Sequence, residues 1–296
     1  MPGTDMSTLR LTAYTTLAMF AFAANSLLCR VALKQTPIDA ASFTSVRILS
    51  GALLLWLLMQ ARTAARGKRG SWRSAAALFI YVAAFSFAYL TLSAGTGALL
   101  LFGAVQVTMI LAGFVAGERM SKIQSAGFIA ALAGLVILVL PGVQAPTLEG
   151  SALMLLSGIA WGMYSLFGRG VADAASATAG NFLRAVPMAL GLSLLTLHWL
   201  KLDAIGVMYA VLSGALASAL GYVIWYRVLR EMSAITASTV QLSAPVIAAV
   251  GGIILLDEAL SLSLQISAAL ILGGIALVLR RKKRKLNFTV SPFLRS

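Results

Sequence analysis

The segment Asp257-Glu258-Ala259-Leu260-Ser261, which precedes an apolar run from Leu262 to Leu279, repeats an earlier part of the chain. Its counterpart is Gly117-Glu118-Arg119-Met120-Ser121, which precedes the apolar run Ile123–Leu140. Glu258 and Glu118 are 140 residues apart, and the chain contains only four Glu residues. A match of two rare residues in the same setting indicates an internal repeat.

A second pair of segments repeats at almost the same offset. Ser26-Leu27-Leu28-Cys29-Arg30 resembles Ser165-Leu166-Phe167-Gly168-Arg169. We therefore predict two halves within one membrane domain, residues 1–144 and 145–296.

Composition places the protein in a membrane. Its 296 residues are 60% hydrophobic, and the mean hydropathy is +0.92. Only 11% of the residues are charged, compared with roughly 25% in soluble domains. The net charge of +14 does not indicate nucleic acid, because the basic residues lie in short gaps between apolar runs and near the C-terminus.

Ten segments are long and apolar enough to cross a bilayer, which takes about 20 residues of helix. They are Leu11–Cys29, Ile38–Met59, Ser74–Leu92, Thr96–Ala116, Ile123–Leu140, Leu148–Gly168, Ala175–Leu197, Ile205–Trp225, Ala234–Leu256 and Leu262–Leu279. The single cysteine, Cys29, excludes an internal disulfide.

Lysine and arginine predict the orientation of these segments. Of the 23 basic residues, only Arg30, Lys34 and Lys201 lie in the odd-numbered connections. Arg47 and Arg184 lie inside predicted spans, and the others share the opposite side. The positive-inside rule therefore predicts that both termini are cytoplasmic.

An odd number of spans in each half gives the repeat a mechanistic meaning. The second five-span half enters the membrane from the opposite side, so we expect an inverted repeat. This architecture is typical of carriers that bind substrate near the midplane, in a central cavity between their halves.

Acidic residues are missing from the interior of every predicted span. Metal-binding and catalytic patterns are missing as well, so we predict neither an enzyme nor a metal or cofactor site. A proton relay through a buried carboxylate is also not expected.

Arg47 and Arg184 occupy the second and seventh spans, which are repeat partners. Each either anchors a substrate carboxylate or caps the carbonyls of a neighbouring helix end. Their occurrence in both halves favours the structural role, because an asymmetric substrate needs only one anchor.

Aromatic and amide residues supply candidate binding groups. Asn25 lies on one face of the first span, and Trp161 and Tyr164 lie on the matching face of the sixth. Tyr81 and Tyr89 share a face of the third span, and Tyr222 lies near the end of the eighth. Trp225 and Tyr226 are predicted to form an interfacial aromatic belt.

The fourth and ninth spans add Gln106, Gln241 and Ser243 near mid-depth. Their alternative role is helix–helix hydrogen bonding. Pro245 in the ninth span removes a backbone donor and is expected to kink that helix, and Val105 stands at its counterpart in the fourth.

These features together resemble the drug/metabolite transporter superfamily, EamA type. The resemblance rests on two five-span halves, on Gly117-Glu118 and Asp257-Glu258 after the fourth and ninth spans, and on the paired arginines. Residues 89–98, leading into 103–106, are similar to the aromatic amino acid exporters of this superfamily. The resemblance implies export of aromatic amino acids and methionine-like compounds across a bacterial inner membrane, through a basket of helices around a central cavity.

We therefore predict an all-α integral membrane transporter that works by alternating access, without a cofactor and without ion coupling. The polar head of the substrate is assigned to Asn25, Gln106, Gln241 and Ser243, and its side chain to Tyr81, Trp161 and Tyr164. Gating or structural roles are assigned to Tyr89, Tyr222, Arg47, Arg184 and Pro245. The alternatives are a multidrug exporter of hydrophobic cations, a nucleotide-sugar or lipid-linked carrier, and a non-transporting membrane protein.

Overall fold

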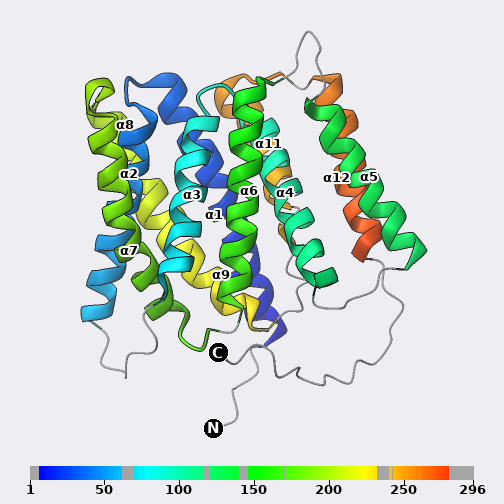
Figure 1. The fold of residues 1–296 in the computed structure, drawn as a ribbon, viewed down its shortest axis with the longest axis horizontal. Coiled ribbons are helices and arrows are strands. Elements are labelled where there is room, and N and C mark those ends of the chain that lie inside the picture. The colour runs from blue at the N-terminus through cyan, green and yellow to red at the C-terminus, as the bar shows by residue number, and fades with distance from the viewer. Residues whose placement is uncertain are drawn as a thin grey trace.

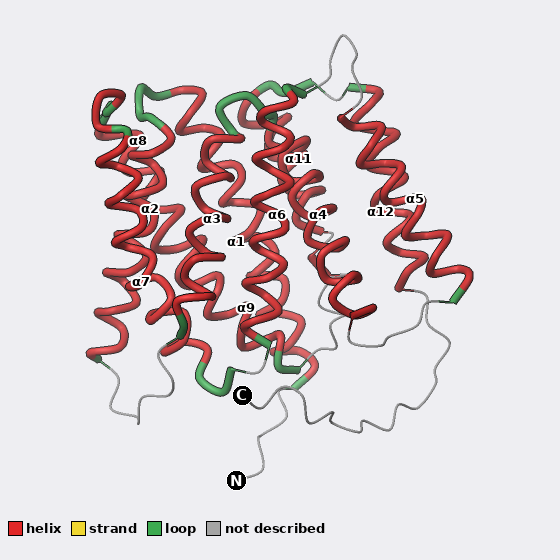
Figure 2. The backbone as a smooth tube through the Cα atoms, viewed as in Figure 1, coloured by secondary structure: helices red, strands yellow, loops and turns green. Residues whose placement is uncertain are grey.

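A computed structural model describes residues 7–61, 70–115, 121–139, 146–169, 171–231, 240–241, 243–259 and 261–279. Every regular element within these ranges is a helix (Figure 2). The repeated segment that contains Glu118 lies outside the described residues.

The helices follow the predicted segments closely, and two have the predicted bounds. The long helices are α1 (Thr8–Gln35), α2 (Ala40–Gln60), α3 (Trp72–Ala88), α4 (Ala94–Val115), α5 (Lys122–Val139), α6 (Leu148–Gly168), α7 (Ala174–Leu195), α11 (Ser243–Leu256) and α12 (Leu262–Leu279). A short 3₁₀ turn, η1 (Leu197–Trp199), follows α7. The helices run alternately up and down the bundle (Figure 1).

Five helical stretches within the described ranges are long and apolar enough to cross a membrane. They are Thr8–Gln35, Ala40–Gln60, Ala94–Gly113, Leu148–Gly168 and Ala204–Leu229. Shorter apolar helices include Trp72–Ala88, Lys122–Leu138, Ser243–Leu256 and Leu262–Gly274.

The predicted eighth span is a composite rather than one regular α-helix. It consists of α8 (Ala204–Val211), the π-helical η2 (Leu212–Leu220) and α9 (Gly221–Leu229), which follow one another without a break. A π-helix bonds residues five apart instead of four, and such segments are frequent at functional sites. The hydrophobic pattern of the sequence does not distinguish the two forms.

Polar caps start several helices and keep acidic groups at the ends of the bundle. Asp39 accepts hydrogen bonds from the amides of Ala41 and Ser42 at the start of α2. Asp173 and Asp203 cap α7 and α8 in the same way. These caps satisfy amides that have no partner inside their own helix.

Two glycines bring α2 and η2 into close contact. A side chain on Gly214 would collide with the carbonyl of Arg47, and one on Gly51 would meet the carbonyl of Gly214 as well as the Phe182 ring of α7. This crossing therefore depends on the absence of a Cβ, and it places Arg47 beside the π-helical segment.

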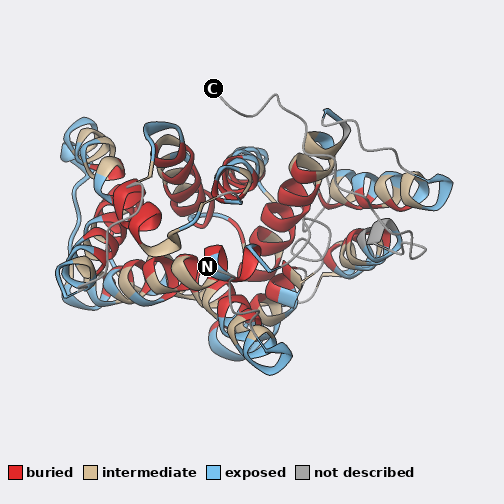
Figure 3. Cartoon of the chain, turned by 90° about the horizontal axis from the view of Figure 1, so that it is seen from below, coloured by how far each residue is buried: buried red, intermediate tan, exposed pale blue. Residues whose placement is uncertain are grey.

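Buried residues lie toward the interior of the bundle and exposed ones toward its outside (Figure 3). The outer surface is strongly apolar, and Leu194 and Ile254 remain 73% and 71% exposed. Large exposed apolar surface is unfavourable in water and fits contact with lipid. The fold thus encloses a set of buried polar side chains within a largely apolar molecule.

Candidate functional site

Arg47 of α2 is fully buried. Its Nε donates to Ser218 Oγ at 3.0 Å. Its Nη2 donates to the hydroxyls of Tyr81 at 3.1 Å and Tyr222 at 2.9 Å. The Tyr222 hydroxyl in turn bonds that of Tyr81 at 3.1 Å. One guanidinium therefore connects α2, α3, η2 and α9.

Asn25 of α1 extends this network through two serines of η2. Its Oδ1 accepts from Ser213 at 2.7 Å and from Ser218 at 3.2 Å. These serines are five residues apart, so in an α-helix they would lie about 140° from each other. The π-helical turn brings both to Asn25 because it closes after five residues.

Trp161 of α6 forms the aromatic part of the site. Its ring centroid lies 4.9 Å from that of Tyr81, 4.7 Å from that of Tyr222 and 5.3 Å from that of Phe22. Its indole Nε1 donates to Gln241 Oε1 at 3.1 Å. The indole is thus held by rings from three other helices and by one polar contact.

The Arg47 charge is stabilised by rings and neutral hydroxyls. Its guanidinium carbon lies 5.4 Å from the Tyr81 centroid and 5.0 Å from the Phe85 centroid, within the range of cation–π attraction. A central arginine costs about 2.5–3.5 kcal/mol to insert into a bilayer. Arg47 Nη1 and Asn25 Nδ2 are buried and make no hydrogen bond to the described part of the chain.

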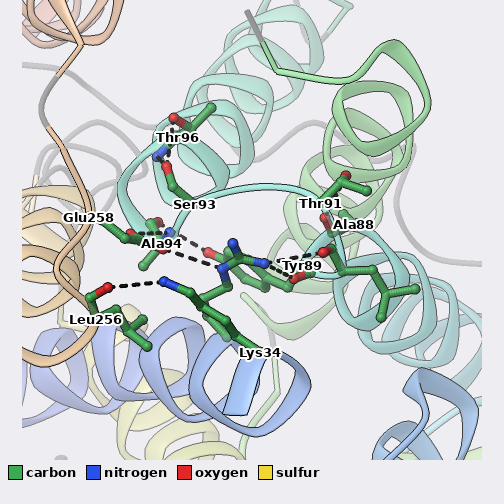
Figure 4. A network of polar contacts seen from close by, with 11 residues as sticks. Lys34, Ala88, Tyr89, Thr91, Ser93, Ala94, Thr96, Leu256 and Glu258 are labelled. Atoms are coloured by element: carbon green, nitrogen blue, oxygen red, sulfur yellow. Dashed lines mark hydrogen bonds and ion pairs between the residues drawn. The ribbon is translucent and has the colours of Figure 1, made fainter. Parts of the chain in front are cut away.

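A second polar network joins three segments (Figure 4). It involves Arg30 and Lys34, which lie near the C-terminal end of α1. Arg30 of α1 pairs with Glu258 at 3.3 Å and donates to the carbonyls of Tyr89 and Leu90. Glu258 Oε2 accepts from the amide of Ala94 at 2.8 Å. We call these contacts the Arg30–Glu258 network.

The backbone after α11 is shaped to present Glu258. Asp257 has a φ of 51°, an unusual left-handed conformation for a residue other than glycine. Lys34 of α1 donates to the carbonyl of Leu256 at 3.0 Å and thus binds the last turn of α11. The end of α11 is therefore fastened to α1 by two basic side chains.

The structure brings together most of the residues predicted to bind substrate. We call the side chains joined by the contacts of Arg47, Asn25 and Trp161 the central cluster. Asn25, Tyr81, Trp161 and Gln241 all belong to it. Tyr164 stacks on Trp161 with a centroid separation of 5.5 Å and also stacks on Tyr226. Arg47 and Tyr222, predicted to be gating or structural, belong to the same cluster.

Other predicted residues lie elsewhere. Ser243 is exposed and donates to the carbonyl of Val240, so it contributes to its own helix start rather than to the cluster. Gln106 is buried on α4, which packs against α6 and α11. Pro245 is in the first turn of α11, where its missing donor costs no hydrogen bond within that helix.

Arg184 and Tyr89 are both outside the central cluster. Arg184 is partly buried, donates to the carbonyl of Gly180 in its own helix and lies over Trp72. The Tyr89 hydroxyl donates to the carbonyl of Ala94, while its own carbonyl accepts from Arg30. Tyr89 is therefore part of the Arg30–Glu258 network.

The predicted aromatic belt of Trp225 and Tyr226 is wrong. Both side chains are buried, at 0% and 1% exposure. The Tyr226 hydroxyl donates to the carbonyl of Tyr164, and Trp225 packs edge-on against Phe22. Their place near the end of an apolar segment suggested an interface, but α9 turns this face toward α1 and α6.

Sequence reasoning missed Ser213, Ser218 and Asn181. The two serines carried no signal, because their spacing does not match an α-helical face. Asn181 did carry a sequence signal, because a side-chain amide inside an apolar span requires a hydrogen-bond partner. It bonds the Tyr164 hydroxyl and accepts from the amide of Ser71.

Two pockets lie away from the central cluster. One of about 140 Å³ lies between α2 and α7 and is lined by Trp56 and Leu183 among others. The other, of about 200 Å³, lies near Asp39 and Trp199. Among the residues placed by the structure, no group of three His, Cys, Asp or Glu side chains is arranged to hold a metal.

Comparison with known proteins relates part of the chain to a transporter family. The model of the EamA-like transporter family matches residues 148–280. The second half of the chain is therefore similar to the EamA-like transporter family. Members of this family, within the drug/metabolite transporter superfamily, are membrane transporters rather than enzymes.

Two relatives and one solved structure are also similar to this chain. An uncharacterized protein of Pseudomonas aeruginosa is 57% identical over 267 residues, covering 90% of this chain and 93% of its own. An uncharacterized transporter of Archaeoglobus fulgidus is 25% identical, covering 73% and 82%. A crystal structure of 18% identity superposes with a TM-score of 0.63 over 92% of this chain and 96% of its own, a likeness of fold.

Proposed function

We propose that this protein exports aromatic and other neutral amphipathic amino acids across a bacterial inner membrane by alternating access. The observation that carries the proposal is the buried cluster around Trp161. Its aromatic rings suit a flat apolar side chain, and the polar groups of Asn25, Arg47 and Gln241 adjoin them. Small-molecule sites combine apolar walls with a few polar groups in this way.

The inverted repeat is part of the proposal, and the helix packing supports it. If each helix of residues 1–144 has its counterpart five spans later, then α3 packing on α6 should correspond to the eighth span packing on α1. That contact is present, and the contact of α4 with α6 likewise has its equivalent in α11 with α1. The helices α2 and α7, α4 and α11, and α5 and α12 pack against their own counterparts, as a two-fold axis requires.

The binding site would then lie where the two halves meet. Arg47 and Tyr81 come from the first half, whereas Trp161, Ser218 and Tyr222 come from the second. In the proposed cycle the halves separate at this cluster and open a central cavity, first to one side and then to the other. The Arg30–Glu258 network is suited to close one side, which the distribution of basic residues assigns to the exterior.

We also propose that transport is not coupled to protons or sodium. Every Asp and Glu in the described ranges lies at a helix end or in a connection, so none is available as a buried relay. A hydrophobic cation is a poor substrate for the same cluster, because Arg47 is itself a buried positive charge.

Uptake into liposomes that hold the purified protein tests the function. Labelled tryptophan, phenylalanine, methionine, lysine and a lipophilic cation are offered separately, with protein-free liposomes as the control. We expect saturable entry of tryptophan and phenylalanine without any ion gradient. Entry of the cation alone would refute the proposal, and uphill accumulation driven by a pH gradient would refute the uncoupled mechanism.

A further inference from the structure

The two arginines inside the bundle, which the repeat treats as equivalent, have different surroundings. Arg184 is partly buried and donates to a carbonyl of its own helix. Arg47 is fully buried, and the acceptors that it contacts are side-chain hydroxyls of three other helical segments. A role in satisfying backbone carbonyls therefore fits Arg184 and does not fit Arg47.

We propose that Arg47 binds a carboxylate group, so that the site selects aromatic monocarboxylates over aromatic amines, whether or not the carboxylate carries an ammonium group beside it. This inference rests on the proposed function and names the substrate class of the same site. Guanidinium groups have donors only, and their planar fork matches the two oxygens of a carboxylate.

Unused donors in the network point to a missing acceptor. Arg47 Nη1 and Asn25 Nδ2 are buried and unsatisfied by the residues that the structure describes. Ser218 connects them, because it accepts from Arg47 Nε and donates to Asn25 Oδ1. A carboxylate has about four acceptor positions, whereas an ammonium group has none.

Charge leads to the same conclusion. Among the described residues, the carboxylate that forms an ion pair is that of Glu258, and its partner is Arg30. Arg47 makes its contacts to the neutral hydroxyls of Ser218, Tyr81 and Tyr222. A buried charge without a counter-ion is unfavourable, so a ligand that brings a negative charge gains more than a neutral one, and a cation is repelled.

The aromatic requirement follows from the position of Tyr81. Its hydroxyl accepts a hydrogen bond from Arg47, and its ring centroid lies 4.9 Å from that of Trp161. The proposed carboxylate site and the aromatic site are therefore separated by the side chain of Tyr81. Entry of a ligand requires the hydroxyls of Tyr81 and Tyr222, which bond each other, to separate. A short chain between ring and carboxylate matches this spacing.

Three related compounds test the inference in proteoliposomes that hold the full chain near neutral pH. Phenylalanine has both charged groups, phenylpropionate has only the carboxylate, and phenethylamine has only the ammonium. We expect saturable entry of the first two, mutual competition between them, and no entry of phenethylamine above that in protein-free liposomes.

Arg47→Gln removes the charge and should lower entry of both carboxylates at least about tenfold, as loss of a charge-assisted bidentate contact predicts. Arg184→Gln is the matched control, since it removes the repeat partner, and entry should stay within about twofold of the wild type. A measurement on the wild type alone avoids any folding defect of the variant. Phenylpropionate should raise the thermal unfolding temperature in detergent, and phenethylamine should not.

Failure of the inference and failure of the proposed function give different results. If phenethylamine enters as fast as phenylpropionate, or a folded Arg47→Gln protein transports phenylalanine normally, the carboxylate site is refuted while transport of aromatic compounds remains. If none of the three compounds enters and none raises the unfolding temperature, both proposals are refuted.

Discussion

Replacement of Glu258 by glutamine should open one end of the bundle. Glu258 binds Arg30 Nε at 3.3 Å and the amide of Ala94 at 2.8 Å, and the two charged side chains are only 10% and 14% exposed. Hydrogen bonds to charged groups contribute roughly 1.5–3 kcal/mol each. Glutamine retains one acceptor oxygen, and Arg30 retains its hydrogen bonds to two carbonyls. We therefore expect the closed state to be destabilised relative to the open state by about 2 kcal/mol, which corresponds to about a 30-fold rise in the open fraction.

The single cysteine of the chain reports this opening without any added label site. Cys29 is buried next to Arg30 and lies close to Arg47 and Ser86, between the two polar networks. Its rate of modification by a water-soluble maleimide should rise about 30-fold in Glu258→Gln, because the rate follows the open population when closing is fast.

Controls distinguish opening from unfolding. Glu149→Gln removes an exposed acidic residue from the same end of the bundle and should leave the Cys29 rate unchanged. Arg30→Gln should raise the rate as Glu258→Gln does, and the double variant should be less than additive because the two residues share one interaction. A Glu258→Gln protein in which Cys29 stays as protected as in the wild type would refute the reasoning.

Three further predictions concern stability and the aromatic site. Gly214→Ala should destabilise the protein by about 1–3 kcal/mol, because the new methyl group meets the Arg47 carbonyl. Gly191→Ala is the control, since no atom lies within 4 Å of the new methyl group, and it should not destabilise the protein. Thermal unfolding in detergent compares the two variants. Asp39→Ala should cost about 1 kcal/mol at neutral pH through loss of a helix cap. Burial raises the pKa of Asp39, but its hydrogen bonds with Ser42, Lys201 and Ala41 outweigh this effect and leave the pKa lowered. The stabilisation by Asp39 is therefore complete above the ordinary pKa of aspartate and is lost as the pH falls through the lowered pKa. If the unfolding temperatures of the wild type and Asp39→Ala differ by the same amount in acid as at neutral pH, this explanation is contradicted. Trp161→Phe should raise the KM for tryptophan, because it removes the indole donor to Gln241. The control is Tyr14→Phe, a change at a partly buried position near Arg227, which should raise the KM less. Equal KM values in the two variants would count against the aromatic site.

Much of the helical layout could be predicted because lipid imposes a strong rule on sequence. Spanning segments must be continuous and apolar, so their approximate ends are visible without tertiary information. Polar residues inside them are costly unless they have partners, which singled out Asn25, Arg47, Trp161 and Gln241 before their contacts were known.

Prediction failed where residues were judged by depth or by periodicity alone. Trp225 and Tyr226 were assigned to the membrane interface from their place near a segment end, although packing buries both. Ser213 and Ser218 were missed because they are paired by a π-helical turn, which the hydrophobic pattern does not reveal. Ser243 was assigned to the site from its depth, although it faces outward.

The sequence by itself determined the membrane location, the helical class and the presence of polar groups at mid-depth. These properties depend on local composition, because the free energy of transferring each segment from water to lipid is set by the residues of that segment. Only the tertiary structure decided which arginine is fully buried among side chains of other helices. Arg47 and Arg184 are the same residue type and lie at matching positions in the proposed repeat. The neighbours of a side chain are set by helix rotation and close packing, which local composition does not encode.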